Sequence, residues 1–165
     1  RKASDFSSAL KVYDNLIQKY PDHPNRYLVE LSRVDSLLAL SSGGSTDEFD
    51  EILAELERLM DLPNLSASFQ LEVGYKLAYV LKKLEYYERA VLVATSMIDR
   101  YPLIVEEASD VSSIGRYWFA RTLFLVSDVL KQLNQVEDAK KLYRLLLEYD
   151  LPGNELAKQY LSELL

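Results

Sequence analysis

Cysteine is absent from the 165 residues of this chain, and histidine occurs only once, at His23. The lack of cysteine excludes disulfide bonds, thiolate metal sites and a cysteine nucleophile. Basic residues are also few: 19 stand against 26 acidic residues, which gives a net charge of −7. This sign argues against a protein whose main task is to neutralise nucleic-acid phosphates or anionic lipid, so we expect no nucleic-acid partner.

Long apolar runs are missing as well. Charged residues interrupt every apolar stretch well before the roughly 18 residues that a membrane span needs, so we expect no membrane-spanning segment. With 48% hydrophobic residues, the chain is nevertheless too apolar for an intrinsically disordered protein. Its length suits a single domain. Because it begins with Arg1 rather than Met, we expect a piece of a longer protein.

Glycine and proline, five of each, stand between stretches whose apolar residues follow a helical spacing. Ala9, Val12 and Leu16, for example, recur at steps of three and four, and no segment alternates with a period of two for long enough to form a strand. The pattern predicts an all-α fold. The expected helices, about eight in number, cover residues 4–20, 25–40, 47–61, 66–84, 87–100, 111–133, 136–148 and 153–164.

Residue types that serve catalysis or cofactor binding are scarce. His23 is flanked by Asp22 and Pro24, so we expect it in a solvated turn between helices. Zinc ligands are lacking, and no Glu-x-x-His motif is present for a di-iron site. No lysine follows Gly43 and Gly44, which favours a flexible linker over a phosphate-binding loop. We predict a non-enzymatic protein with no catalytic residues, no metal and no cofactor.

One pattern occurs three times along the chain. A small residue is followed four positions later by a second small residue or a tyrosine, three positions after that by an apolar residue, and then by proline. The matched sets are Ala9, Tyr13, Leu16 and Pro21; Ala90, Ala94, Met97 and Pro102; and Ala139, Tyr143, Leu146 and Pro152. A small residue lets two helices approach closely, and proline is expected to end the helix.

Two of these segments are preceded by a second helix that also repeats. Each such helix places a small residue between two apolar ones. The matched residues are Leu77, Ala78 and Leu81 before Ala90, and Val126, Ser127 and Leu130 before Ala139. Units of about 34 residues, each a helix, a turn and a helix, are therefore expected at 71–104 and 120–153. This pattern resembles the tetratricopeptide repeat (TPR) family.

The resemblance implies a right-handed superhelical array of antiparallel helix pairs, a TPR-like α-solenoid, in one domain over residues 1–165. Further units are expected at about 4–40 and, in degenerate form, at 47–84. Residues 153–164 are expected to form a capping helix. The residues from Leu103 to Tyr117 are expected to lengthen the leading helix of the last unit.

The endings Tyr20-Pro21 and Tyr101-Pro102 are similar to those of the bacterial cell-envelope branch of the family. That branch includes outer-membrane assembly lipoproteins and Tol-Pal accessory proteins. This similarity favours the periplasm or cell envelope over the cytoplasm.

In the TPR family, the concave face usually grips an extended peptide or a partner helix. The register of the family therefore implies a partner-binding groove that also includes Glu72. Its main residues are Tyr75, Tyr79, Lys82, Lys83, Arg121, Phe124, Asp128 and Lys131. Aromatic and basic side chains together favour a protein or peptide partner of acidic character. Packing inside the helical array is the alternative role for the tyrosines, and it is the role expected for Trp118.

Two functions remain open from the sequence. The favoured one is a scaffold or adaptor that holds a segment of another protein. The alternative is a structural spacer or self-association domain of a larger protein. In that case the N-terminal helices would join two copies through Ala9, Val12, Leu16 and Leu28.

Overall fold

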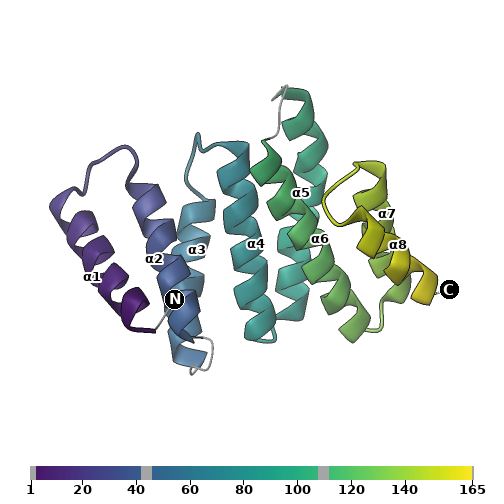
Figure 1. Cartoon of the computed structure of the whole chain (residues 1–165), viewed down its shortest axis with the longest axis horizontal. Helices are drawn as coiled ribbons and strands as arrows, with labels where there is room; N and C mark the ends of the chain where they lie inside the picture. The colour runs from purple at the N-terminus through teal and green to yellow at the C-terminus, as the bar shows by residue number, and fades with distance from the viewer. Residues whose placement is uncertain (1–2, 42–45, 108–111, 165) are drawn as a thin grey trace. The chain divides into compact units, whose positions relative to one another are not determined.

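The structure, a computed structural model, describes residues 3–41, 46–107 and 112–164, and within these ranges it consists of helices without any strand. This confirms the predicted all-α class and the number of helices (Figure 1). The helices are α1 (Ala3–Lys19), α2 (Arg26–Leu40), α3 (Thr46–Met60), α4 (Ala67–Lys83), α5 (Tyr87–Glu107), α6 (Ser113–Gln132), α7 (Val136–Glu148) and α8 (Asn154–Glu163). None of the described helices is long and apolar enough to cross a bilayer.

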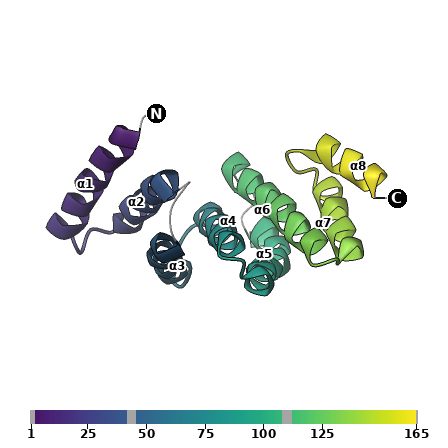
Figure 2. The same ribbon diagram turned by 90° about the horizontal axis from the view of Figure 1, so that it is seen from below.

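The chain divides into two compact units, an N-terminal unit of Arg1–Leu62 and a C-terminal unit of Pro63–Leu165. Residues 1–165 were expected to form one domain, and the degenerate repeat expected at 47–84 extends across the boundary between the two units. We describe each unit by itself. In the N-terminal unit, α2 contacts both α1 and α3. In the C-terminal unit, α4 contacts α5 and α6, α6 contacts α5 and α7, and α7 contacts α8 (Figures 1 and 2).

The three helices of the N-terminal unit are tied together by ion pairs. Glu30 of α2 is buried, and its carboxylate accepts from Arg26 at 2.7 Å and lies 2.5 Å from the guanidinium of Arg58 on α3. Arg33 of α2 bridges Asp14 of α1 and Glu51 of α3. Exposed pairs of this kind contribute little individually, but a buried carboxylate such as Glu30 needs its partners.

The C-terminal unit is built around the small residues of the repeat. Ala78 and Ser127 on the leading helices and Ala90 and Ala139 on the following helices are all completely buried. Because each lacks a large side chain, the backbones of α4 and α5, and of α6 and α7, can approach closely. The Ser127 hydroxyl donates to the Leu123 carbonyl oxygen at 2.7 Å, so this buried polar group is satisfied within its own helix.

The turns that end the repeated helices have the same geometry. Glu85 after α4 and Asn134 after α6 both adopt a left-handed conformation, with φ of 61° in each case. Asp150, after α7, has a φ of 45°. In each turn the amide of the next residue closes a bond to a carbonyl five positions back. These bonds are Tyr86 N to Leu81 O, Gln135 N to Leu130 O, and Leu151 N to Leu146 O, at 2.8, 2.8 and 2.9 Å. This hydrogen-bond pattern is typical of Schellman helix ends.

Two helix boundaries differ from the prediction. Helix α5 continues to Glu107, so Pro102 does not end it. Proline removes only its own backbone donor, and the amides that follow can still extend the helix. Helix α6 begins only at Ser113, capped by the Ser112 hydroxyl, which accepts from the Gly115 amide at 3.2 Å. The extra residues therefore lengthen α5 as well, and residues 108–111 lie outside the described part of the chain.

Candidate functional site

The contact between α4 and α6 brings several predicted groove residues together. Arg121 of α6 donates from Nη2 to the Tyr75 hydroxyl oxygen of α4 at 2.6 Å. Its guanidinium carbon also lies 4.5 Å from the centroid of the Tyr75 ring. The Tyr79 ring, one turn further along α4, stacks on Tyr75 with a centroid separation of 6.4 Å. Side chains about 46 residues apart in sequence thus share one cluster.

Tyr75 itself is not open to solvent. Only 9% of it is exposed, and the Trp118 ring lies 5.2 Å from the Tyr75 ring. Burial raises the pKa of the Tyr75 phenol, and the nearby positive charge of Arg121 only partly opposes this effect. The expectation that Tyr75 lines an open groove is therefore wrong, because Trp118 and Arg121 of the neighbouring helix cover it. Trp118 has the packing role expected for it.

The residues around the C-terminal end of α4 do surround an open cavity, of about 320 Å³. Tyr79 is half-buried there, and the Lys83 ammonium lies 5.5 Å from the centroid of its ring. The lining consists of Tyr79, Lys82, Lys83, Glu85, Tyr87, Leu125 and Gln132. Three of the predicted groove residues therefore meet at one concave surface. We call this cavity the α4–α6 pocket.

Asp128 of α6 lies between two of the predicted lysines. Its carboxylate is 2.9 Å from the Lys131 ammonium and 3.9 Å from that of Lys82. Burial lowers the pKa of Lys131, but the neighbouring Asp128 carboxylate and Tyr143 hydroxyl outweigh this effect, so the pKa is raised overall. Asp128 therefore offsets part of the positive charge of both Lys131 and Lys82, and Lys82 and Lys83 are the cations that line the α4–α6 pocket.

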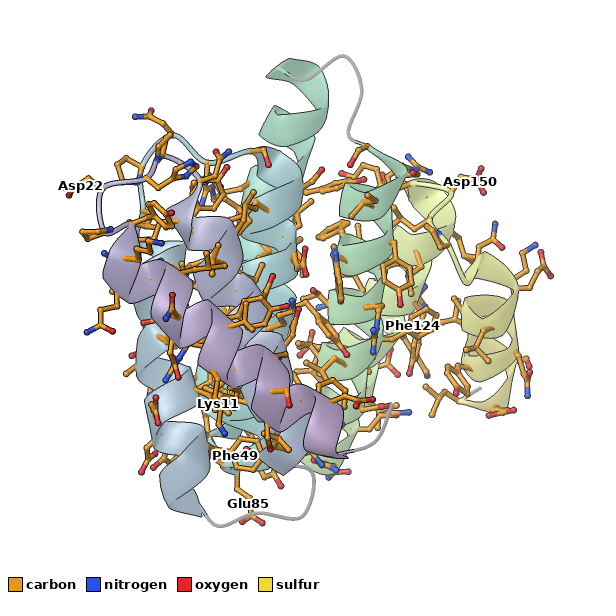
Figure 3. The ribbon with its side chains drawn as sticks, turned by 60° about the vertical axis from the view of Figure 1, so that its left-hand side comes forward. Lys11, Asp22, Phe49, Glu85, Phe124 and Asp150 are labelled. Carbon is orange, nitrogen blue, oxygen red and sulfur yellow. The ribbon has the colours of Figure 1, made fainter. Side chains whose placement is uncertain are left out.

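Phe124 does not lie on the surface where it was expected. Its side chain is labelled in Figure 3. The Phe124 ring is 6.0 Å from the Tyr143 ring of α7 and 6.3 Å from the Tyr160 ring of α8. The Lys131 ammonium also lies 5.2 Å from the centroid of Tyr160. The C-terminal helix α8 thus covers this part of α6. Phe124 contacts the rings of α7 and α8 and does not line the α4–α6 pocket.

A buried lysine next to this cluster had no clear signal in the sequence. Lys76 is buried, and its ammonium lies 2.5 Å from the Glu72 carboxylate and 5.4 Å from the centroid of the Trp118 ring. Glu72 was expected on the inner face, and it instead serves as the counter-ion of Lys76. The Trp118 ring of α6 stabilises the Lys76 ammonium by a cation–π contact, which explains how a buried cation is accommodated here.

His23 has the position predicted for it. It is exposed in the turn between α1 and α2, and its Nδ1 accepts from the Asn25 amide at 3.1 Å. No group of three or more carboxylate or imidazole side chains within the described residues has an arrangement that could hold a metal ion.

No family model matches this chain, and no curated protein or solved structure is significantly similar to it. The assignment of a function therefore rests on the geometry of the two units.

Proposed function

We propose that this chain is a non-enzymatic binding module that holds an acidic segment of a partner protein at the α4–α6 pocket. The observation that carries the proposal is the meeting of Tyr79, Lys82 and Lys83 at one cavity of about 320 Å³. In a chain with a net charge of −7, a concave surface with two lysines and one acidic lining residue, Glu85, is a local departure from the overall charge. Such a surface attracts carboxylates.

The pocket offers two complementary kinds of contact. The half-buried Tyr79 ring supplies rigid apolar area, which loses little conformational entropy on binding. Lys82 and Lys83 supply flexible ammonium groups that reach a carboxylate as point charges. Both lysines also lie in the last turn of α4, where their positive charges stabilise the helix by interacting with the negative end of its dipole.

The proposal includes an architecture of TPR-like antiparallel helix pairs, α4 with α5 and α6 with α7, within the C-terminal unit. The contact of α4 with α6 and the matching turns at Glu85 and Asn134 support this arrangement. In a solenoid of such pairs, the leading helices line one face, which is where Tyr79 and Lys82 lie. The resemblance that suggested this family also suggests a bacterial cell-envelope complex as its setting.

Peptide selection tests the proposal directly. A phage-displayed library of random peptides is panned against the 165-residue chain, and enriched peptides are synthesised with a fluorescent label. We expect enrichment of Asp and Glu. We expect Lys83→Glu to weaken binding by about tenfold or more, which corresponds to about 1.4 kcal/mol. Tyr79→Ala should also weaken it, because the apolar contact is lost.

Matched controls come from elsewhere in the C-terminal unit. Lys141→Glu reverses the charge of an exposed lysine on α7, and Tyr86→Ala removes an exposed tyrosine that does not line the pocket. Both should bind like the unmodified chain. Peptides without acidic enrichment, or equal loss of binding in Lys83→Glu and Lys141→Glu, would contradict the proposal.

Self-association is the second candidate function, and exposed apolar side chains in the N-terminal unit favour it. Val12, Leu16 and Leu28 are all exposed. Sedimentation velocity over a wide range of concentrations would show a species of twice the chain mass if these helices join two copies. A monomer at every concentration would rule this candidate out.

A further inference from the structure

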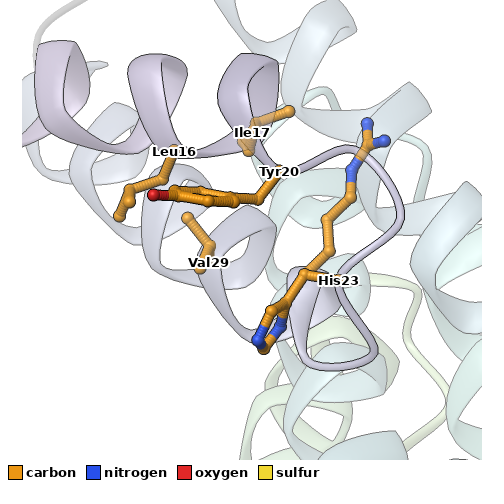
Figure 4. Close-up of a pocket in the computed structure, with 6 residues that line it drawn as sticks. Leu16, Ile17, Tyr20, His23 and Val29 are labelled. Atoms are coloured by element: carbon orange, nitrogen blue, oxygen red, sulfur yellow. The ribbon is translucent and has the colours of Figure 1, made fainter.

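A second concave surface lies in the N-terminal unit, between α1 and α2. One cavity, of about 330 Å³, is lined by Leu16 and Tyr20 on the side of α1 and by Val29 on the side of α2. Figure 4 shows these three side chains gathered at the cavity, with His23 in the connecting turn. Its lining is largely apolar, which distinguishes it from the α4–α6 pocket.

The concave surface continues along the two helices. A neighbouring cavity of about 390 Å³ has a mixed lining, with Phe6, Ala9 and Tyr13 of α1 beside the polar residues Asp5, Ser32, Asp35 and Ser36. Four of the lining residues recur at steps of four, three and four and so form a single stripe: Ala9, Tyr13 and Leu16 of α1, and Tyr20 directly after it. We call this surface the α1–α2 groove.

The stripe of α1 is the first copy of the internal repeat, and it differs from the later copies in its exposure. Leu16 is 37% exposed, whereas the matching Met97 and Leu146 are 3% and 0% exposed. Tyr20 is 47% exposed, whereas the matching Tyr101 is 1% exposed. The same residue positions are thus core in α5 and α7 and open in α1.

A leading helix accounts for the burial in the later copies. Helix α4 packs on α5, and α6 packs on α7. Gly74 of α4 lies directly against Met97, since a Cβ atom at Gly74 would overlap the Met97 sulfur. Helix α4 also contacts α6, so it lies against both α5 and α6. Helices α1 and α2 form a contacting pair whose Leu16 and Tyr20 no described helix buries.

We propose that the α1–α2 groove is the docking site for one amphipathic helix of a partner protein, seated as α4 is seated on α5 and α6. Its apolar face would carry a small residue opposite Leu16, as Gly74 stands opposite Met97, with apolar residues spaced like Leu77 and Leu81. This site lies in the other unit and takes a different ligand from the α4–α6 pocket, so the two proposals stand or fall separately.

A second copy of the chain is a poor source for such a helix. Among the described residues, the leading-helix faces of this type are on α4 and α6, and their central residues Ala78 and Ser127 are completely buried in their own unit. For α4 or α6 to dock on another copy, the core of the C-terminal unit would have to be exposed. Docking of a helix from a separate partner does not require this.

The test uses the sequence of α4 as the probe. A fluorescent peptide of residues 66–84, held helical by a staple between positions 79 and 83, is titrated into the 165-residue chain. These positions lie off the stripe of Gly74, Leu77 and Leu81. We expect saturable binding, and we expect no binding of the same peptide with Gly74→Trp and Ala78→Arg, which destroy the small face.

Variants of the chain locate the binding. Leu16→Asp and Tyr20→Glu should each weaken it by about tenfold or more, because a buried carboxylate in the groove is strongly disfavoured. Both positions are exposed, so the fold should tolerate them, and circular dichroism checks this. Leu92→Asp, at an exposed apolar residue of α5, is the matched control and should bind normally.

Three results would overturn the proposal. The first is an absence of binding, and the second is binding that Leu16→Asp and Tyr20→Glu leave unchanged. The third is a dimer of the chain by sedimentation that Leu16→Asp dissociates, since the groove would then be covered by a second copy. None of these results bears on acidic peptides at Lys83.

Discussion

The Tyr101 hydroxyl group is buried and, within the described residues, has no hydrogen-bond partner. The ring of Tyr101 stacks on Phe119 at 3.8 Å between centroids and meets Tyr149 edge-on at 5.3 Å. These ring contacts need no hydroxyl. A buried polar group without a partner costs about 1–3 kcal/mol of folding free energy, so this hydroxyl destabilises the core of the C-terminal unit.

Replacing the hydroxyl tests this account. We expect Tyr101→Phe to raise the free energy of unfolding by about 1 kcal/mol, because the ring contacts stay and the desolvated oxygen is removed. Urea denaturation followed by circular dichroism measures the change. Tyr86→Phe, at an exposed tyrosine, should leave stability unchanged. A loss of stability in Tyr101→Phe would show that the hydroxyl has a partner in solution.

Burial also raises the pKa of the Tyr75 and Tyr101 phenols above the ordinary value of 10.0. Each phenol has a higher pKa in the folded chain than in the unfolded chain. The stability that its protonated form contributes is therefore present in full below about pH 10, and it is lost as the pH rises through the pKa of the folded state. We expect urea midpoints to fall above about pH 10 and to fall less steeply in Tyr101→Phe. Equal slopes in the two proteins would mean that Tyr101 titrates alike in the folded and unfolded chain.

At the scale of elements, the junction between α7 and α8 depends on one glycine. Gly153, which precedes α8, has a φ of 87°, in the left-handed region that residues other than glycine rarely adopt. A Cβ atom there would lie 2.8 Å from the Phe124 ring. Helix α8 thus reaches its place over Phe124 only because position 153 has no side chain.

We therefore expect Gly153→Ala to lower the free energy of unfolding by about 1–3 kcal/mol, from backbone strain together with the clash. In a Phe124→Leu background the clash is relieved but the strain remains, so the loss should be smaller and should not vanish. Thermal denaturation of the four proteins of this cycle measures both parts. A neutral Gly153→Ala would show that α8 can shift away from α6 without loss.

At the scale of the whole molecule, the two units differ in how fully their helices are buried. Helix α1 has no buried side chain among residues 5–19, whereas α6 buries Phe119, Leu123 and Val126 along with further residues. Helices with few buried contacts open with lower free energy.

Hydrogen exchange with mass spectrometry should show this difference. We expect the amides of α1 to exchange much faster than those of α6, and we expect the helical probe peptide to slow exchange in α1 and α2 alone. Equal protection of α1 and α6 in the free chain would mean that the α1–α2 groove is already covered in solution. That result would favour self-association over an open groove.

The helices and their ends follow closely from local sequence. Apolar spacing predicted all the described helices, and a local serine caps α4: the Ser66 hydroxyl accepts from the Phe69 amide at 3.3 Å. Repeat spacing placed Ala78, Ala90, Ser127 and Ala139 at close helix contacts, and these residues are fully buried. Such features depend on neighbours within one or two turns, so a single sequence contains them.

The continuation of α5 past Pro102 departs from this local reasoning. A proline in a helix disfavours one hydrogen bond, and whether the helix continues depends on the rest of the chain around it. The sequence marks Pro102 as a candidate end in the same way as Pro21, where the helix does end after Lys19. The local conformational preference of proline alone does not distinguish a helix that ends before Pro21 from one that continues past Pro102.

The all-α class, the helix stripes and the residue types available for a binding surface follow from the amino-acid order alone. The fold was needed to reveal which of those residues are open: Trp118 covers Tyr75, α8 packs against Phe124, and Tyr79 and Lys83 line a cavity. It also showed that Leu16 is exposed where Met97 is buried. The physical reason is that helical periodicity is set within a few residues, whereas burial depends on which distant helix packs against a given face.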